Sequence, residues 1–72
     1  MSKKIQKILG KLEEIHKELE ILQEEMQDTY DNRSERWQES EKGEEYMEQI
    51  DALEDAASSV RDAIDYLSDY SE

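Results

Sequence analysis

The stretch YDNRSERWQESEKGEEY, residues 30–46, decides the fold, because it interrupts two long segments of regular apolar spacing. It contains the only tryptophan of the chain, Trp37, and one of its two glycines, Gly43. The 72 residues include no proline and no cysteine, so neither a proline break nor a disulfide organises the fold. The stretch therefore predicts a connector between two helices.

The connector carries its own signals for helix ends. Asn32 and Ser34 have short polar side chains that compete for backbone hydrogen bonds, so the first helix is expected to end there. Asn32 followed three residues later by Glu35 resembles a capping box. We therefore expect a short helical turn over 34–40, with a second weak point at 40–43.

On both sides of the connector, apolar residues recur at alternating spacings of three and four, the heptad pattern of helices that pack against a partner. The first stripe consists of Ile5, Ile8, Leu12, Ile15, Leu19, Leu22 and Met26. The second stripe consists of Tyr46, Ile50, Leu53, Ala57, Val60, Ile64 and Leu67. We predict one all-α domain over residues 1–72, with a helix at about 3–30, a connector at 31–43 and a helix at about 44–69.

Charge predicts how the two helices are arranged. Residues 1–17 carry five lysines and two glutamates, whereas residues 54–72 carry six acidic residues and one arginine. An antiparallel hairpin brings these oppositely charged ends together, and we expect the lysines to pair with Asp62, Asp65 and Asp69. Exposed ion pairs contribute only about 0–1 kcal/mol each, so they would select the arrangement rather than hold it together.

The apolar surface exceeds what a two-helix hairpin can cover. The second helix has a further stripe of mostly small residues, Ala52, Ala56, Ser59, Ala63, Tyr66 and Tyr70, and Leu9 and Ile21 widen the apolar surface of the first helix. A chain this short hides only about 60% of its unfolded surface. We expect a homodimer in which two hairpins form a four-helix bundle, and a domain-swapped dimer with one continuous helix through 30–46 is an alternative.

Trp37 has two interpretations. The connector would place it over the open end of the hairpin, where Met26, Tyr30, Tyr46 and Met47 meet, so it could bury its ring there. Alternatively, it is an exposed anchor for a partner, since tryptophan is common at binding hot spots. We count Trp37 among the candidate partner-binding residues and favour burial, because the chain has little other core.

The sequence offers no catalytic machinery. His16 is the only imidazole, so no His–His pair is available, and no nucleophile–base pair is visible in the sequence. Glu13 and His16 have the E-x-x-H spacing of di-iron bundles, but one copy is insufficient. We predict no enzyme activity, no metal and no cofactor. Residues 1–10 include lysines but no long apolar run, so neither a signal peptide nor a membrane span is expected.

Acidic residues dominate the second helix. The chain has a net charge of −12, and a row of carboxylates lies opposite the second apolar stripe. The members of this acidic row are Glu41, Glu44, Glu48, Asp51, Asp55, Asp62, Asp65 and Asp69. Its field repels nucleic acid but suits a basic protein surface, where closely spaced anions can imitate a phosphate backbone. The alternative is a solvated face without a partner.

From residue 31 onward, DNRSERWQESEKGEEYMEQIDALEDAASSVRDAIDYL resembles small acidic helical proteins of bacteriophages and mobile elements of low-GC Gram-positive bacteria. Their pattern is a first helix rich in lysine and glutamate, a DN…Q.SEK connector, and an acidic second helix. The resemblance implies an accessory protein that acts in the host bacterial cytosol. It further implies an inhibitor of a host nucleic-acid-binding or defence protein, of the anti-CRISPR or anti-restriction type. The competing hypothesis is a structural homo-oligomer with no inhibitory role.

Overall fold

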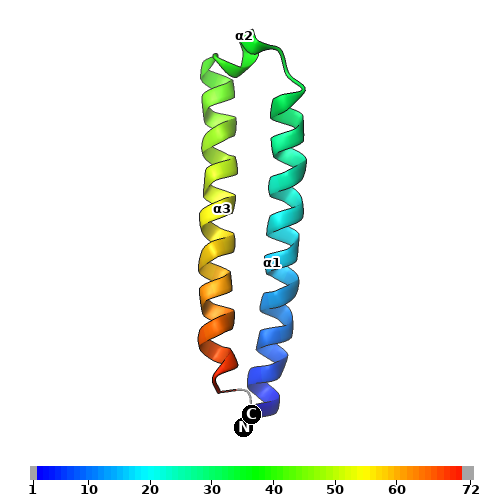
Figure 1. Ribbon diagram of the computed structural model, residues 1–72, viewed down its shortest axis with the longest axis vertical. Coiled ribbons are helices and arrows are strands. Elements are labelled where there is room, and N and C mark those ends of the chain that lie inside the picture. Colours follow the sequence, from blue (N-terminus) through cyan, green and yellow to red (C-terminus); the bar gives the residue numbers. More distant parts are fainter. Residues whose placement is uncertain (1, 71–72) are drawn as a thin grey trace.

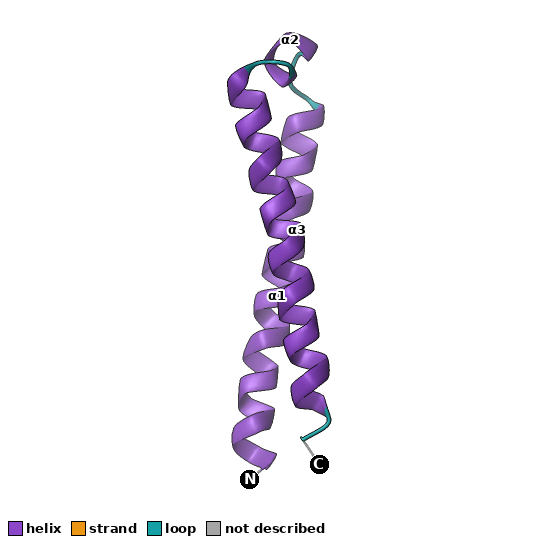
Figure 2. Ribbon diagram, turned by 90° about the vertical axis from the view of Figure 1, so that its left-hand side faces the viewer, coloured by secondary structure: helices purple, strands orange, loops and turns teal. Residues whose placement is uncertain are grey.

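The structure is a computed structural model that describes residues 2–70, and it consists of two long antiparallel helices joined by a short one (Figure 1). Helix α1 spans Ser2–Asp31, α2 spans Glu35–Gln38 and α3 spans Glu41–Ser68. The molecule measures 54 × 14 × 12 Å, so it is one helix long and two helices wide. The prediction of an all-α chain with a long helix pair is confirmed. In Figure 2, α1 and α3 cross one another, as heptad-patterned helices do when they supercoil.

The seam between α1 and α3 follows the predicted stripe on α3. Ile50 and Ala57 are buried there, with Ile50 only 2% exposed. The remaining stripe members of α3 are partly buried: Tyr46, Leu53, Val60, Ile64 and Leu67. Because α3 has one apolar column with alternating spacings of three and four, only this side of the helix can pack against α1.

On α1 the predicted stripe is wrong at every second position. Ile8, Ile15 and Leu22 are 49%, 44% and 44% exposed, so they lie outside the seam. The seam instead consists of Ile5, Leu9, Leu12, His16, Leu19, Gln23, Met26 and Tyr30, all of them buried or partly buried. Both columns alternate spacings of three and four, and they share Ile5, Leu12, Leu19 and Met26. Compared with the prediction, α1 is therefore rotated about its axis so that its Leu9 side faces α3. This rotation brings two polar side chains, His16 and Gln23, into the seam.

His16, one of these two polar residues, contacts a carboxylate of its own helix. Its side chain is 17% exposed, and its Nδ1 atom lies 3.4 Å from Oε1 of Glu20, one turn further along α1. In the frame of the first predicted stripe, Glu13 would face outward and His16 would only flank the core. Glu13 is indeed exposed, but His16 occupies a seam position.

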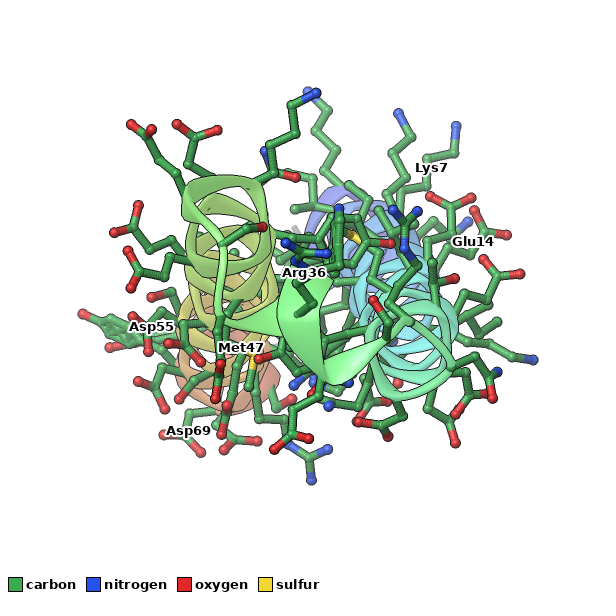
Figure 3. All side chains as sticks on the ribbon, turned by 90° about the horizontal axis from the view of Figure 1, so that it is seen from above. Lys7, Glu14, Arg36, Met47, Asp55 and Asp69 are labelled. Atoms are coloured by element: carbon green, nitrogen blue, oxygen red, sulfur yellow. The ribbon has the colours of Figure 1, made fainter. Side chains whose placement is uncertain are left out.

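The predicted ion pairs between the helix ends are absent from residues 2–70. This part of the chain has two pairs of oppositely chargeable groups within ion-pair distance. His16–Glu20 lies within α1, and Arg61–Asp65 lies within α3. Seen from above in Figure 3, Lys7 of α1 and Asp69 of α3 point away from each other on opposite sides of the hairpin. Apolar packing along the seam, and not cross-helix pairing, therefore holds the arrangement together.

Two serines cap the helices of the connector. The backbone N–H of Trp37 donates to Oγ of Ser34 at 3.2 Å, and that of Gly43 donates to Oγ of Ser40, also at 3.2 Å. Ser34 is thus the N-cap of α2, in place of the predicted Asn32. Because Ser40 caps α3, this helix begins at Glu41, three residues before the predicted start.

Gly43 lies where the connector folds against the first turn of α3. A Cβ atom added there would lie 2.5 Å from the carbonyl oxygen of Gln38 and 2.8 Å from its carbonyl carbon, and closer still to the carbonyl oxygen of Trp37. The φ angle of Gly43 is not positive, so space rather than backbone conformation requires glycine. Residues 40–43, predicted as a weak point, are instead a tight contact between two helices.

Trp37 closes this end of the hairpin. Its ring packs edge-on against Tyr30 at 6.0 Å and against Tyr46 at 5.5 Å between ring centroids. The guanidinium carbon of Arg33 lies 4.2 Å from the centre of the Trp37 ring, in a cation–π arrangement. The side-chain amide of Gln38 donates to the carbonyl oxygen of Tyr30 at 2.8 Å and ties α2 to the end of α1. Trp37 is consequently half-buried, with the geometry of a plug between the two long helices.

Candidate protein-interaction surface

The acidic row is exposed over its whole length. Each of its eight carboxylates extends from the side of α3 opposite the seam, and all eight residues are exposed. In Figure 3, Asp55 points outward on the side of α3 that is farthest from α1, and Asp69 points outward below α3 in the view. The seam fixes this orientation, because residues that follow the same heptad on the opposite side of a helix must face away from its partner.

The geometry of the row can be compared with that of nucleic acid. From Glu41 to Asp69 there are 28 residue steps, or about 42 Å at 1.5 Å per residue. One strand of duplex DNA places about 12 phosphates over that length, at 3.4 Å per phosphate. Eight carboxylates therefore reproduce about two-thirds of the charge density of a single strand. They do so along one uninterrupted helix and its C-cap residue, Asp69.

Little opposes the charge of the row. Within residues 2–70, Asp65 alone of its members lies within ion-pair distance of a basic group, at 3.5 Å from Nε of Arg61. Arg61 and Asp65 are both about two-thirds exposed, so this pair is well screened by water. Ser58 is the one neutral side chain in the row. The row therefore presents a continuous negative field to solvent.

Trp37, the other candidate for partner binding, does not join the acidic row. It lies between Tyr30 and Tyr46 at the end of the hairpin, and its ring faces are occupied by these contacts and by Arg33. The row and Trp37 are thus separate features of the molecule. Of these two candidates, the row is the one that offers an extended exposed surface.

Chemically reactive groups do not gather anywhere in the described part of the chain. Among residues 2–70, no three side chains of His, Cys, Asp or Glu are close enough together to hold a metal ion. The Glu13–His16 pair is divided between the outside of α1 and the seam. No helix within residues 2–70 is both long enough and apolar enough to cross a membrane.

No protein family, no curated protein and no solved structure matches this chain. The resemblance to small acidic phage proteins stays a prediction.

Sequence reasoning missed one exposed surface. Ile8, Ile15 and Leu22, which we call the α1 ridge, were assigned to the core of the hairpin but lie on its flank. Tyr30 carried the signal that could have revealed this, because Leu9, His16, Gln23 and Tyr30 recur at intervals of seven. Tyr30 contacts Trp37 in the connector, and this contact is consistent with the Leu9 column facing α3.

Proposed function

We propose that this protein is a non-enzymatic interaction module whose acidic row binds a basic, nucleic-acid-binding site on another protein. The observation that carries the proposal is the continuous exposure of eight carboxylates on one rigid helix face. Like charges at i and i+4 destabilise a helix by about 0.2–0.5 kcal/mol per pair. A face built only to be solvated could avoid this cost by including lysines, as α1 does with Lys11 and Lys17.

The same charge determines the class of partner. With a net charge of −12, the protein repels nucleic acid and attracts basic surfaces. A groove lined with arginine and lysine for phosphates accepts a row of carboxylates by the same charge pairing. A protein bound in this way would block nucleic acid from the groove, and its action would be inhibition by occupation.

The biological setting of the proposal comes from the resemblance of residues 31–67 to phage and mobile-element proteins. In that setting the partner is a host defence protein, such as a restriction or CRISPR nuclease, in the bacterial cytosol. A CRISPR nuclease holds nucleic acid in a long, positively charged channel, which suits the sign and the length of a carboxylate row of about 42 Å.

The test is an affinity pull-down with the tagged full-length protein from lysate of a low-GC Gram-positive host, washed at low and at high salt. The row variant carries Glu48→Gln, Asp51→Asn, Asp55→Asn and Asp62→Asn. A control variant removes four exposed acids of α1 through Glu13→Gln, Glu14→Gln, Glu24→Gln and Asp28→Asn. Both variants have a net charge of −8, so they differ in the position of the lost charges and not in their number.

A nucleic-acid enzyme should be recovered by the wild type and by the control variant at low salt, and lost at high salt because of screening. The row variant should not recover it. If both variants recover the same enzyme equally, the row is not the binding surface. If only the protein itself is recovered by every bait, the proposal fails.

The second candidate function is that of a structural homo-oligomer without a target. The exposed α1 ridge favours it, since monomeric proteins rarely expose contiguous apolar patches larger than a few hundred Å². In that case the carboxylates serve solubility alone, and neutralising the row leaves the behaviour of the protein unchanged.

A further inference from the structure

The α1 ridge is an apolar surface without a partner in the single chain. Ile8, Ile15 and Leu22 are spaced seven residues apart, so they form one straight line along the flank of α1. In an antiparallel pair, the corresponding flank of α3 presents Ala56 and Ala63. Their short side chains leave the ridge accessible to another helix.

The surface area of the chain also indicates a missing partner. Its accessible surface is 5843 Å². A compact monomer of 8.6 kDa would expose about 4,700 Å². The excess of about 1,100 Å² is on the order of the 800 Å² that each partner buries in a standard interface. The hairpin thus has enough surplus surface for one stable contact.

Charges beside the ridge identify what that partner is. Lys4, Lys11, Glu18 and Glu25 also recur every seven residues, and all four are exposed on the solvent side of the ridge. Their signs are positive, positive, negative, negative. When a second copy of α1 is laid antiparallel, Lys4 faces Glu25 of that copy and Lys11 faces Glu18.

The apolar residues obey the same register. In an antiparallel pair centred on Ile15, Ile8 faces Leu22 of the other copy and Ile15 faces itself. The residue numbers of each ridge pair sum to 30 and those of each charged pair sum to 29. The two centres therefore differ by half a residue, about 0.75 Å along the helix, and one axis beside Ile15 serves both. An interface between two identical surfaces must be self-complementary in this way, because every contact occurs twice.

We infer that this face binds a second copy of the chain, with a two-fold axis passing beside Ile15 and the two α1 helices antiparallel across it. The two hairpins then form a four-helix bundle whose second seam is the α1 ridge. The acidic row lies on a different side of α3, so each copy keeps its row exposed. The dimer goes beyond the proposed function, and its test measures mass rather than target binding.

The first experiment is sedimentation equilibrium over the micromolar range, with Ile15→Lys compared against Ile21→Lys. Ile15 and Ile21 have the same chemistry and nearly the same exposure, 44% and 46%, but Ile21 lies off the ridge. The wild type and Ile21→Lys should sediment at twice 8.6 kDa, and Ile15→Lys at 8.6 kDa. Equal helical ellipticity at 222 nm would show that both variants still fold.

A wild type that remains at 8.6 kDa throughout would overturn the inference. So would an Ile15→Lys variant that remains dimeric, as a domain-swapped dimer would, or an Ile21→Lys variant that becomes monomeric.

A charge swap then tests the register. Lys11→Glu and Glu18→Lys should each weaken dimerisation by about tenfold, because each reverses two symmetry-related contacts. The double variant, Lys11→Glu with Glu18→Lys, should return to within about threefold of the wild type, since the contacts between copies are restored with signs exchanged. Within one chain these residues are seven positions, about 10.5 Å, apart, so direct pairing does not produce this rescue. A double variant as weak as the sum of the singles would refute the antiparallel register.

Discussion

Replacing each of the two glycines with alanine should change stability in opposite directions. At Gly10, an exposed position in the N-terminal third of α1, a Cβ would have nothing within 4 Å. Gly10→Ala should therefore raise stability by about 0.5–1 kcal/mol, because alanine loses less backbone entropy in a helix. At Gly43 the same Cβ would collide with backbone atoms of Trp37 and Gln38. Backbone cannot move aside as the end of a flexible side chain can.

The cost at Gly43 has several sources. Overpacking costs about 1–3 kcal/mol, and a displaced connector also weakens the Ser40 cap, which is worth about 1 kcal/mol. The helix propensity of alanine returns up to about 1 kcal/mol. The net loss for Gly43→Ala is about 2 kcal/mol, so the two variants should differ by about 3 kcal/mol.

Urea and thermal unfolding, followed by ellipticity at 222 nm at one protein concentration, measures this difference. Each kcal/mol shifts Tm by about 4–8 °C in a domain of this size, so the two midpoints should differ by at least about 12 °C. The concentration must be fixed because association would stabilise the folded state. If both variants have higher urea and thermal midpoints than the wild type, the connector does not pack on the first turn of α3 as described.

Three other changes test separate parts of the fold. Ser40→Ala should lower the free energy of unfolding by about 1 kcal/mol through loss of the α3 cap, whereas Ser58→Ala, mid-helix and exposed, should not lower it in urea titrations. Trp37→Ala should cost about 2 kcal/mol in the same titrations, less than a fully buried tryptophan, and an unchanged midpoint would mean that the ring is no plug. His16→Leu should raise Tm, because an apolar side chain in the seam stabilises the fold by about 1 kcal/mol and the pair with Glu20 contributes little. A lower Tm would show that the fold needs His16 at this position.

The sequence predicted the architecture because two heptad stripes flank a connector rich in helix-ending residues. On α3 the register was correct as well, because Ile50, Leu53, Ala57 and Val60 belong to one apolar column only. On α1 two columns compete, and counting apolar residues favours Ile8, Ile15 and Leu22. The observed rotation of α1 is instead consistent with the contact between Tyr30 and Trp37. These residues lie seven positions apart on opposite sides of the turn between α1 and α2, so the heptad pattern of α1 does not reveal the contact.

The connector was less predictable than the helices. Asn32 and Ser34 are both good N-cap residues, and only the path of the chain determines that Ser34 accepts from Trp37. From the sequence, Gly43 looked like a helix breaker. Its actual role depends on carbonyl groups of α2 that pack against it, and no local sequence pattern specifies the position of α2. The acidic row, by contrast, could be placed from the sequence, since its exposure follows from the α3 register.

The most direct test of the proposed role of the acidic row is a competition experiment with the enzyme recovered by the pull-down. Binding of that enzyme to a labelled DNA duplex is measured while wild type, row variant or control variant is added at low salt. Wild type and control variant should displace the DNA with equal potency, and the row variant should not displace it. If the row variant displaces DNA as well as the wild type does, or if no variant displaces it, the acidic row does not occupy a nucleic-acid site.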